Sequence, residues 1–149
     1  MLGGNPTDNR SEYLVDTNGC FDLLPHWPCA LLQEARRHGD ALIVALNTDA
    51  SVHELKPQEK GPSRPVVPQE ERAELLAALR CVDAVVLFDT PTPEAFLKAL
   101  RPNIHVKGAQ YTPETLPEWP LLQSLHTQLV LAPMIAGQST SALIAKIRG

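Results

Sequence analysis

The strongest constraint on the fold is the alternation of short apolar runs with longer amphipathic segments. Residues 41–46 are almost continuously apolar, and residues 84–88 repeat this pattern later in the chain. Such runs are typical of strands buried on both faces of a parallel sheet. Between them lie segments with apolar residues at helical spacing, such as 28–38. The alternation predicts an α/β fold with a doubly wound parallel sheet and right-handed crossovers.

The pattern places about five strands in this Rossmann-like sheet. We expect Gly39 to cap the end of the first helix and Thr92 to cap the start of a later one. The predicted strands are 13–15, 41–46, 84–88, 103–106 and 128–132. The predicted helices are 28–38, 69–79, 93–100, 119–125 and 142–148.

The chain of 149 residues has the length of one domain. Residues 1–12 have neither the apolar pattern of a strand nor that of a helix, so we expect a flexible N-terminal arm followed by a single domain at 13–149. The segment 56–68 is rich in proline and charge and predicts a long surface loop, of the kind that often covers a ligand.

Charge and composition argue against several classes of partner. The net charge of −4 is unlike that of a protein that binds a nucleic-acid backbone. No apolar run approaches the roughly 20 residues needed to cross a membrane, and the first residues do not have the order of a signal peptide. The spacing of Cys20, Cys29 and Cys81 suits neither a disulfide framework nor a zinc site. We therefore expect a cytoplasmic protein without a protein-bound metal site.

Polar clusters follow several of the predicted strands. Because ligands bind beyond the carboxyl ends of strands in an open α/β sheet, these clusters are the candidate site. Two of them stand near helix starts, where backbone N–H groups favour phosphate. The alternative is that they are ordinary turns and helix caps. The clusters are 17–22, 47–49, 107–108 and 137–141.

The same segments resemble, in order and spacing, the cytidylyltransferase-like nucleotidyltransferases, in particular the nucleotidyltransferase domain of ADP-heptose synthase. The first motif is Asn18-Gly19-Cys20-Phe21-Asp22-Leu23-Leu24. Further matching segments are 39–40, 43–52, 55–56, 64–65, 71–79, 82–83, 106–108 with Tyr111, and 137–141. The resemblance implies transfer of a nucleotidyl group from a nucleoside triphosphate to a sugar 1-phosphate or similar phosphorylated acceptor, with release of pyrophosphate.

The resemblance also implies the partners and the roles of single residues. It favours ATP over CTP, brings Mg²⁺ with the nucleotide phosphates, and allows a homodimer. Lys56 would act in catalysis by reaching phosphates, although a solvated loop lysine is the alternative. The implied nucleotide-binding residues are Asn18, Gly19, Cys20, Phe21, Asp22, Lys107, Gly108, Ser139, Thr140 and Ser141. For Gly19 the alternative is a tight turn, and for Asp22, Ser139 and Thr140 it is a capping role.

Pro25-His26-Trp27-Pro28 stands where the resembling family carries a catalytic His-x-Gly-His. Proline has no side-chain donor and no backbone N–H, and loss of one well-placed donor costs a rate factor of about 10²–10³. His26 is a displaced candidate for the catalytic role, with a solvent-exposed loop histidine as the alternative. Asp16 is a second departure, because it is an acid in an apolar strand: it would repel phosphate or lie at the exposed strand end.

Three functions therefore stay open. The chain is a transferase, weakened by the altered motif; or a non-catalytic nucleotide-binding protein on the same scaffold; or one subunit of a hetero-oligomer whose partner supplies the missing groups. A transferase would release pyrophosphate, and a binding protein would bind nucleotide without turnover. A subunit of a hetero-oligomer would be active only when mixed with its partner.

Overall fold

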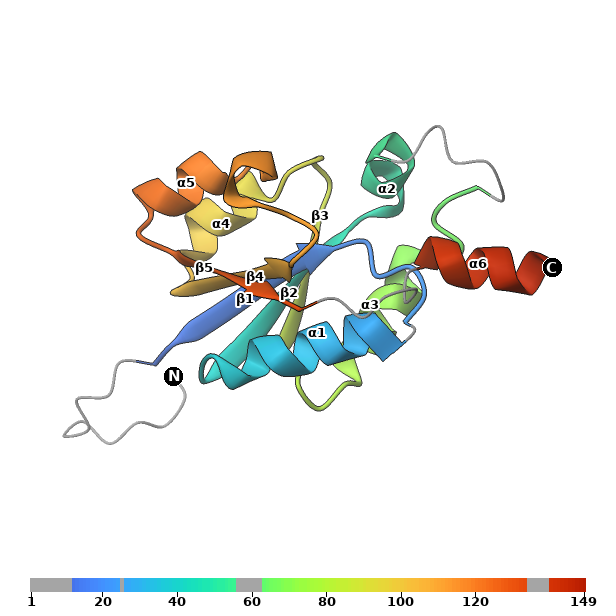
Figure 1. Ribbon diagram of the computed structural model, residues 1–149, viewed down its shortest axis with the longest axis horizontal. Helices are drawn as coiled ribbons and strands as arrows, with labels where there is room; N and C mark the ends of the chain where they lie inside the picture. The colour runs from blue at the N-terminus through green and yellow to red at the C-terminus, as the bar shows by residue number, and fades with distance from the viewer. Residues whose placement is uncertain (1–11, 25, 56–62, 134–139) are drawn as a thin grey trace.

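The computed structural model describes residues 12–24, 26–55, 63–133 and 140–149, without the side chains of 140–142. Its centre is a five-stranded parallel sheet in the order β3-β2-β1-β4-β5 (Figure 1). This confirms the predicted fold class. The order reverses between β1 and β4, which creates a crevice at the carboxyl ends of these two strands. The strands are β1 (Leu14–Gly19), β2 (Ala41–Asn47), β3 (Ala84–Phe88), β4 (Ile104–Gly108) and β5 (Gln128–Ala132).

Helices cover both faces of the sheet. Figure 1 shows α1 (His26–Arg37) and α3 (Gln69–Ala77) on one face, with α4 (Glu94–Leu100) and α5 (Trp119–Ser124) on the other. The chain closes with α6 (Thr140–Arg148). Two short elements were not predicted, α2 (Asp49–Leu55) and the 3₁₀ helix η1 (Pro113–Thr115). Only two residues of α2 are buried, so it carries no apolar stripe that a sequence pattern could reveal.

Three local predictions were wrong at their boundaries. Strand β1 runs through to Gly19 because Asn18 pairs with Ala45 of β2, and strand pairing outweighs the turn preference of Asn-Gly. Thr92 is not a cap, since α4 starts after Pro93 without a side-chain capping bond. Gly39 lacks a left-handed φ: a Cβ there would lie 2.6 Å from the Tyr13 carbonyl oxygen, so its role is close packing.

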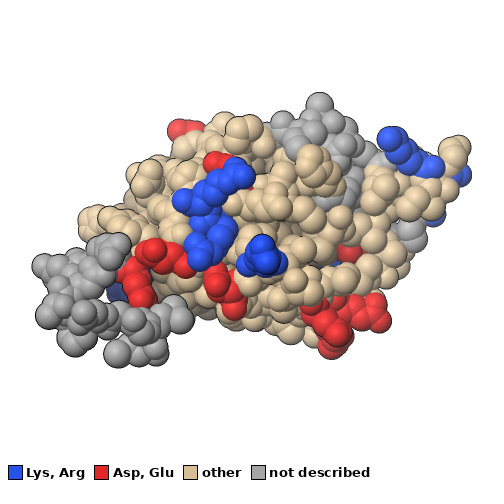
Figure 2. All heavy atoms as spheres, turned by 90° about the horizontal axis from the view of Figure 1, so that it is seen from below, with Lys and Arg blue, Asp and Glu red and all other residues tan. Residues whose placement is uncertain are grey.

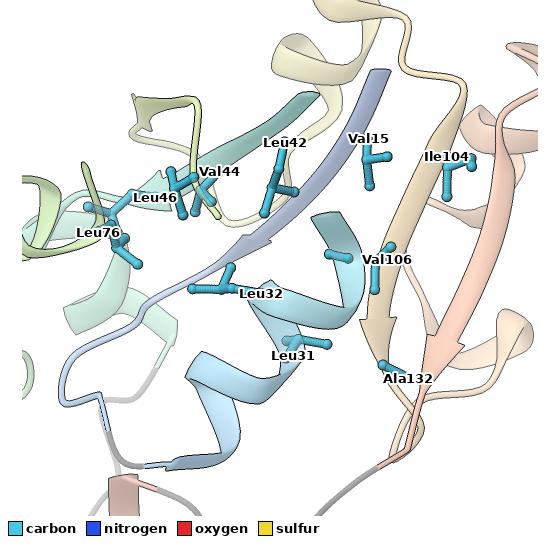
Figure 3. Packing of buried hydrophobic residues seen from close by; sticks show 12 residues of the cluster. Val15, Leu31, Leu32, Leu42, Val44, Leu46, Leu76, Ile104, Val106 and Ala132 are labelled. Carbon is cyan, nitrogen blue, oxygen red and sulfur yellow. The ribbon is translucent and has the colours of Figure 1, made fainter. Parts of the chain in front are cut away.

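The core lies between α1, α3 and one face of the sheet. Leu31 and Leu32 of α1 point toward the side chains of four strands (Figure 3), and Ala35, on the same stripe, belongs to the same buried cluster. The helical spacing of this stripe confirms the pattern that the sequence predicts. The core residues from the strands and α3 are Val15, Leu42, Val44, Leu46, Leu76, Ile104, Val106 and Ala132.

The surface mixes charges of both signs. On the face shown in Figure 2, basic side chains lie beside acidic ones. Two ion pairs at the surface are Arg36 Nε with Asp83 at 3.1 Å and Arg37 with Glu34 at 2.8 Å. This face therefore presents no continuous basic surface for a nucleic-acid backbone. Within the described ranges, no helix combines the length and apolarity needed to span a membrane.

Arg72 connects the ends of the two central strands. Its side chain is fully buried, and the guanidinium donates to the carbonyl oxygens of Cys20 (2.7 Å) and Asn47 (2.8 Å). It also donates to the Val67 carbonyl (2.8 Å) and to Asp49 Oδ1 (2.7 Å). A single side chain of α3 thereby joins the residue after β1, the end of β2, the start of α2 and the segment before α3.

We predict that Arg72→Met lowers the free energy of unfolding by about 3 kcal/mol or more, because it leaves buried carbonyl groups without donors. Urea denaturation followed by circular dichroism measures this change. The control is Arg80→Met, since Arg80 is exposed and its replacement should change stability by less than about 0.5 kcal/mol. Equal unfolding midpoints for the two variants would contradict this stabilising role of Arg72.

Candidate active site

A pocket of about 610 Å³ opens at the carboxyl ends of β1 and β4. This volume is that of a small-molecule site, and the position is the crevice at the reversal of the strand order. Its walls come from the β1–α1 turn, the start of α1, the end of β4 and the segment around η1. Among the lining residues are Thr17, Asn18, Trp27, Lys107, Tyr111 and Glu118.

Most of the expected nucleotide-binding residues meet at this pocket. The lining residues among them are Asn18, Gly19, Cys20, Phe21, Asp22, Lys107 and Gly108. Thr140 and Ser141 begin α6, whose first side chains are outside the described part, as are Lys56 and Ser139. His26 is the first residue of α1 rather than a loop residue; it is exposed and does not line the pocket. The predicted catalytic role of His26 gains no geometric support.

The turn between β1 and α1 has an unusual backbone. Phe21 adopts a left-handed φ of 45°, which is uncommon for a bulky residue. This conformation brings the Phe21 ring over Gly19, where an added Cβ would lie only 3.0 Å from Phe21 Cε2. Gly19, which lines the pocket, thus leaves room for the close approach of this ring. Strain of this kind is found where the surroundings fix the chain, often at functional sites.

Asp22 anchors the segment before α3. Its buried carboxylate accepts bonds from Arg64 Nε (2.7 Å) and from the backbone N–H groups of Val66 and Val67 (2.8 Å for the shortest of each). The expected alternative for Asp22 was a capping role. Its carboxylate does accept bonds from backbone N–H groups, as a capping residue would, but these groups belong to residues 66 and 67 before α3. Direct contact of Asp22 with a nucleotide stays a prediction, whereas its structural role is plain.

Lys107 is a buried cation at the end of β4. Only 9% of the residue is exposed, and Nζ donates to the backbone oxygen and to Oδ1 of Asn18 at 3.2 Å each. The ammonium also lies 4.9 Å from the centroid of the Tyr111 ring, within the range of a cation–π contact. Burial lowers the pKa of Lys107. The structure therefore brings together Asn18 and Lys107, which are 89 residues apart in the sequence.

Trp27 and Gly108 pack against each other at the pocket wall. A Cβ on Gly108 would lie 2.0 Å from Gln110 Oε1 and 2.9 Å from Trp27 Cζ2, so glycine leaves room for both side chains. Trp27 Nε1 is buried, and the described residues supply it with no hydrogen-bond partner. A bulky side chain thus fills space at the position for which the resemblance implies the glycine of a His-x-Gly-His motif.

A chain of three buried charged groups, Asp16, His105 and Glu118, lies behind the pocket. His105 Nδ1 is 2.8 and 2.9 Å from the Asp16 oxygens, and Nε2 is 3.3 Å from Glu118 Oε1. Asp16 and His105 are fully buried and face each other across the β1–β4 pairing. Asp16 is therefore not at an exposed strand end, as one alternative expected. Sequence patterns did not reveal His105 and Glu118 as site residues; the one available signal was a histidine, like Asp16, inside an apolar strand.

The protonation of this chain follows from its contacts. Burial alone would lower the pKa of His105, but the charge of Asp16 and the bonds to both carboxylates outweigh it and raise this pKa to about 8. Burial raises the pKa of Asp16 despite the opposing effect of His105. For Glu118, burial is outweighed by the bonds and by Lys107, so its pKa is lowered. At neutral pH His105 is therefore mostly protonated, and its imidazolium lies between the carboxyl groups of Asp16 and Glu118.

Comparison with known proteins matches residues 17–141 to the cytidylyltransferase-like family model. The chain belongs to this family. The match starts at Thr17 in β1 and ends at Ser141 in α6, so it spans every wall of the pocket. The family membership confirms the resemblance that the ordered segments predict.

Curated relatives are close in sequence but much longer. The chain is 47% identical over 138 residues to the bifunctional protein HldE of Syntrophotalea carbinolica, covering 93% of this chain and 27% of the relative. It is 48% identical over 139 residues to the bifunctional protein HldE of Streptomyces coelicolor, covering 92% and 29%. The chain therefore spans between a quarter and a third of the length of these relatives.

Solved structures support the fold. The lipopolysaccharide core biosynthesis protein from Thermoplasma volcanium has a TM-score of 0.63 at 20% identity, covering 84% of this chain and 98% of that one. The pantoate-beta-alanine ligase from Francisella tularensis has a TM-score of 0.59 at 14% identity, covering 88% and 64%. At these identities the likeness shows a shared fold.

We predict that thermal stability falls as pH rises from about 5.5 to about 9, the range that spans the unfolded and folded pKa values of His105. A raised pKa on His105 means that the stabilisation by its imidazolium is complete below pH 6.5 and is lost as pH passes through the folded value of about 8. At about 1.4 kcal/mol per pKa unit the loss is about 2 kcal/mol. For a chain of this size that is a fall in Tm of roughly 4–8 °C, measurable by scanning calorimetry.

The matched control is Asp16→Asn. Without the Asp16 charge, burial dominates and lowers the pKa of His105, so the fall in Tm across this pH window should vanish. A parent protein whose Tm is constant or rises between these pH values would contradict the bridged imidazolium.

Proposed function

We propose that this chain is a nucleotidyltransferase that joins a nucleotidyl group from a nucleoside triphosphate to a sugar 1-phosphate or similar phosphorylated acceptor. The observation that carries the proposal is the pocket at the β1–β4 crevice, where the first family motif meets Lys107. The relatives named bifunctional protein HldE and the family of the chain support it. The resemblance favours ATP over CTP as the donor.

In the proposed reaction an oxygen of the acceptor phosphate attacks the α-phosphorus of the triphosphate. The bond between the α-phosphorus and its bridging oxygen breaks, and pyrophosphate leaves with the bonding electrons. The protein would orient the two substrates and stabilise the negative charge of the phosphates. Backbone groups of 18–20 and the ammonium of Lys107 would face these phosphates. Lys56 and the segment Ser139–Ser141 are proposed as further phosphate contacts.

We propose that Mg²⁺ enters with the nucleotide phosphates. Across the described part of the chain, no group of His, Cys, Asp and Glu side chains is arranged to hold a metal ion. The carboxylate of Asp22, the acid within the first motif, is occupied by Arg64 and two backbone N–H groups. Such a site fits an ion held mainly by phosphate oxygens, where it neutralises their charge.

A second candidate is a nucleotide-binding protein without turnover. It is favoured by the residues that start α1: Pro28 offers no donor, Trp27 fills the wall beside Gly108, and His26 does not line the pocket. A third is a subunit whose partner completes the site. A cytoplasmic location and a homodimer are further proposals, supported by the cysteine spacing and by the resemblance.

The transferase proposal predicts pyrophosphate release that requires both ATP and a sugar 1-phosphate. A coupled pyrophosphate assay with ATP or CTP and a panel of sugar phosphates measures it. Absence of release with every pair, together with a nucleotide-induced rise in Tm, would replace the transferase by the binding protein. Absence of both effects would reject both candidates.

We further predict that Pro25→His with Trp27→Gly and Pro28→His raises the rate of pyrophosphate release about 10²-fold or more, since each well-placed donor is worth this order of magnitude. Trp27→Gly alone is the control, because it opens the wall without adding a donor. If the triple variant folds and binds ATP but gains no rate, the altered motif does not limit catalysis.

A further inference from the structure

Glu118 places a negative charge in a pocket that is otherwise prepared for phosphate. It lies directly before α5 and lines the same pocket as Lys107, with 4% of its side chain exposed. Its Oε1 is held 3.3 Å from His105 Nε2. An ionised carboxylate has about four acceptor positions, so this bond leaves others for a ligand.

His105 and Asp16 fix the position of the Glu118 carboxylate. Asp16 on β1 holds His105 Nδ1 through both oxygens, and the opposite ring nitrogen then faces Glu118. Through His105, the residue that directly precedes α5 is thus connected to β1, the central strand of the sheet. A buried ionic group seldom adds stability over apolar side chains of similar volume. Its distinctive effect here is to hold one carboxylate in place at the pocket.

The two charges in the pocket determine which ligand chemistry fits. A carboxylate accepts hydrogen bonds and repels a phosphate, so the ligand atoms beside Glu118 must be donors such as hydroxyl groups. Lys107 attracts an anionic group within the same pocket. A molecule with hydroxyl groups next to a phosphate satisfies both side chains.

We propose that Glu118 binds the hydroxyl groups of the acceptor, and that His105 and Asp16 are positioning residues that hold Glu118 in the orientation this contact needs. The inference rests on the proposed function, and it deepens it by naming the group that recognises the hydroxyl-bearing part of the acceptor. Bonds to a charged acceptor of this kind are stronger than neutral ones, so Glu118 would contribute much of the selectivity.

The test is isothermal titration calorimetry on the whole chain with glucose 1-phosphate, mannose 1-phosphate and glycerol 3-phosphate, each against inorganic phosphate. Titrations run with and without α,β-methylene-ATP. We expect Glu118→Gln to weaken the best polyol phosphate about 10-fold or more, as for loss of a charged hydrogen-bond partner. The affinity for inorganic phosphate should not fall and is expected to rise, because a ligand without carbon-bound hydroxyl groups makes no use of the Glu118 carboxylate and is repelled by its charge.

Two further variants separate positioning from folding. His105→Gln keeps a donor for Glu118 and should retain more affinity for the polyol phosphate than His105→Leu, which keeps none. The control is Glu114→Gln: Glu114 is an exposed acid of the neighbouring η1 that does not line the pocket, so no affinity should change. Circular dichroism and Tm check that each variant is folded.

Three outcomes would overturn the inference. The first is an equal loss of affinity for polyol phosphate and inorganic phosphate in Glu118→Gln, and the second is no loss of affinity for either ligand. The third is that the parent chain binds no polyol phosphate at all. Nucleotide binding and pyrophosphate release are measured in separate assays. The three outcomes above therefore do not decide whether the chain transfers nucleotidyl groups.

Discussion

The guanidinium of Arg72 holds the carboxyl end of the sheet in the form that the pocket requires. In a parallel sheet the last carbonyl groups of neighbouring strands lie side by side, and burying them is costly unless a donor satisfies them. Arg72 donates to the carbonyl of Cys20 after β1 and to that of Asn47 at the end of β2. The turn that carries the first family motif therefore leaves the sheet from a fixed point.

A second ionic contact continues this arrangement. Arg64 and two backbone N–H groups bind Asp22, which fixes the segment that leads into α3 against the same turn. The two arginines act on successive parts of the turn, because Arg72 fixes where it begins and the Asp22 contact fixes how it proceeds. Lys107 and Glu118 also line the pocket, and His105 holds Glu118 without lining the pocket itself. Buried charged groups thus fix both the first turn of the pocket and the segment that carries Glu118.

The sequence predicted the strands well, because each of them carries an apolar run. For β3 the expected burial on both faces was wrong: it is an edge strand, and Val86 and Leu87 are 41% and 42% exposed. The sequence also predicted Asn18 and Lys107 together, since the carboxyl ends of parallel strands meet at one edge. It missed α2, which buries only Ser51 and Val52, and it missed the His105–Glu118 contact. That contact depends on strand register and on the path of an irregular segment, neither of which leaves a periodic pattern. Lys56 and Ser139 lie outside the described residues, so their roles stay predictions.

The contact between Trp27 and Gly108 has a consequence for how this site changes over evolutionary time. A Cβ at position 108 would meet Gln110 Oε1 at 2.0 Å and Trp27 Cζ2 at 2.9 Å, so a larger residue there requires both side chains to move. Positions 27 and 108 therefore constrain each other across 81 residues of sequence, although they belong to different elements. A lineage that enlarges position 108 must displace or replace both neighbours, and the order in which such mutations arrive decides which of them are tolerated.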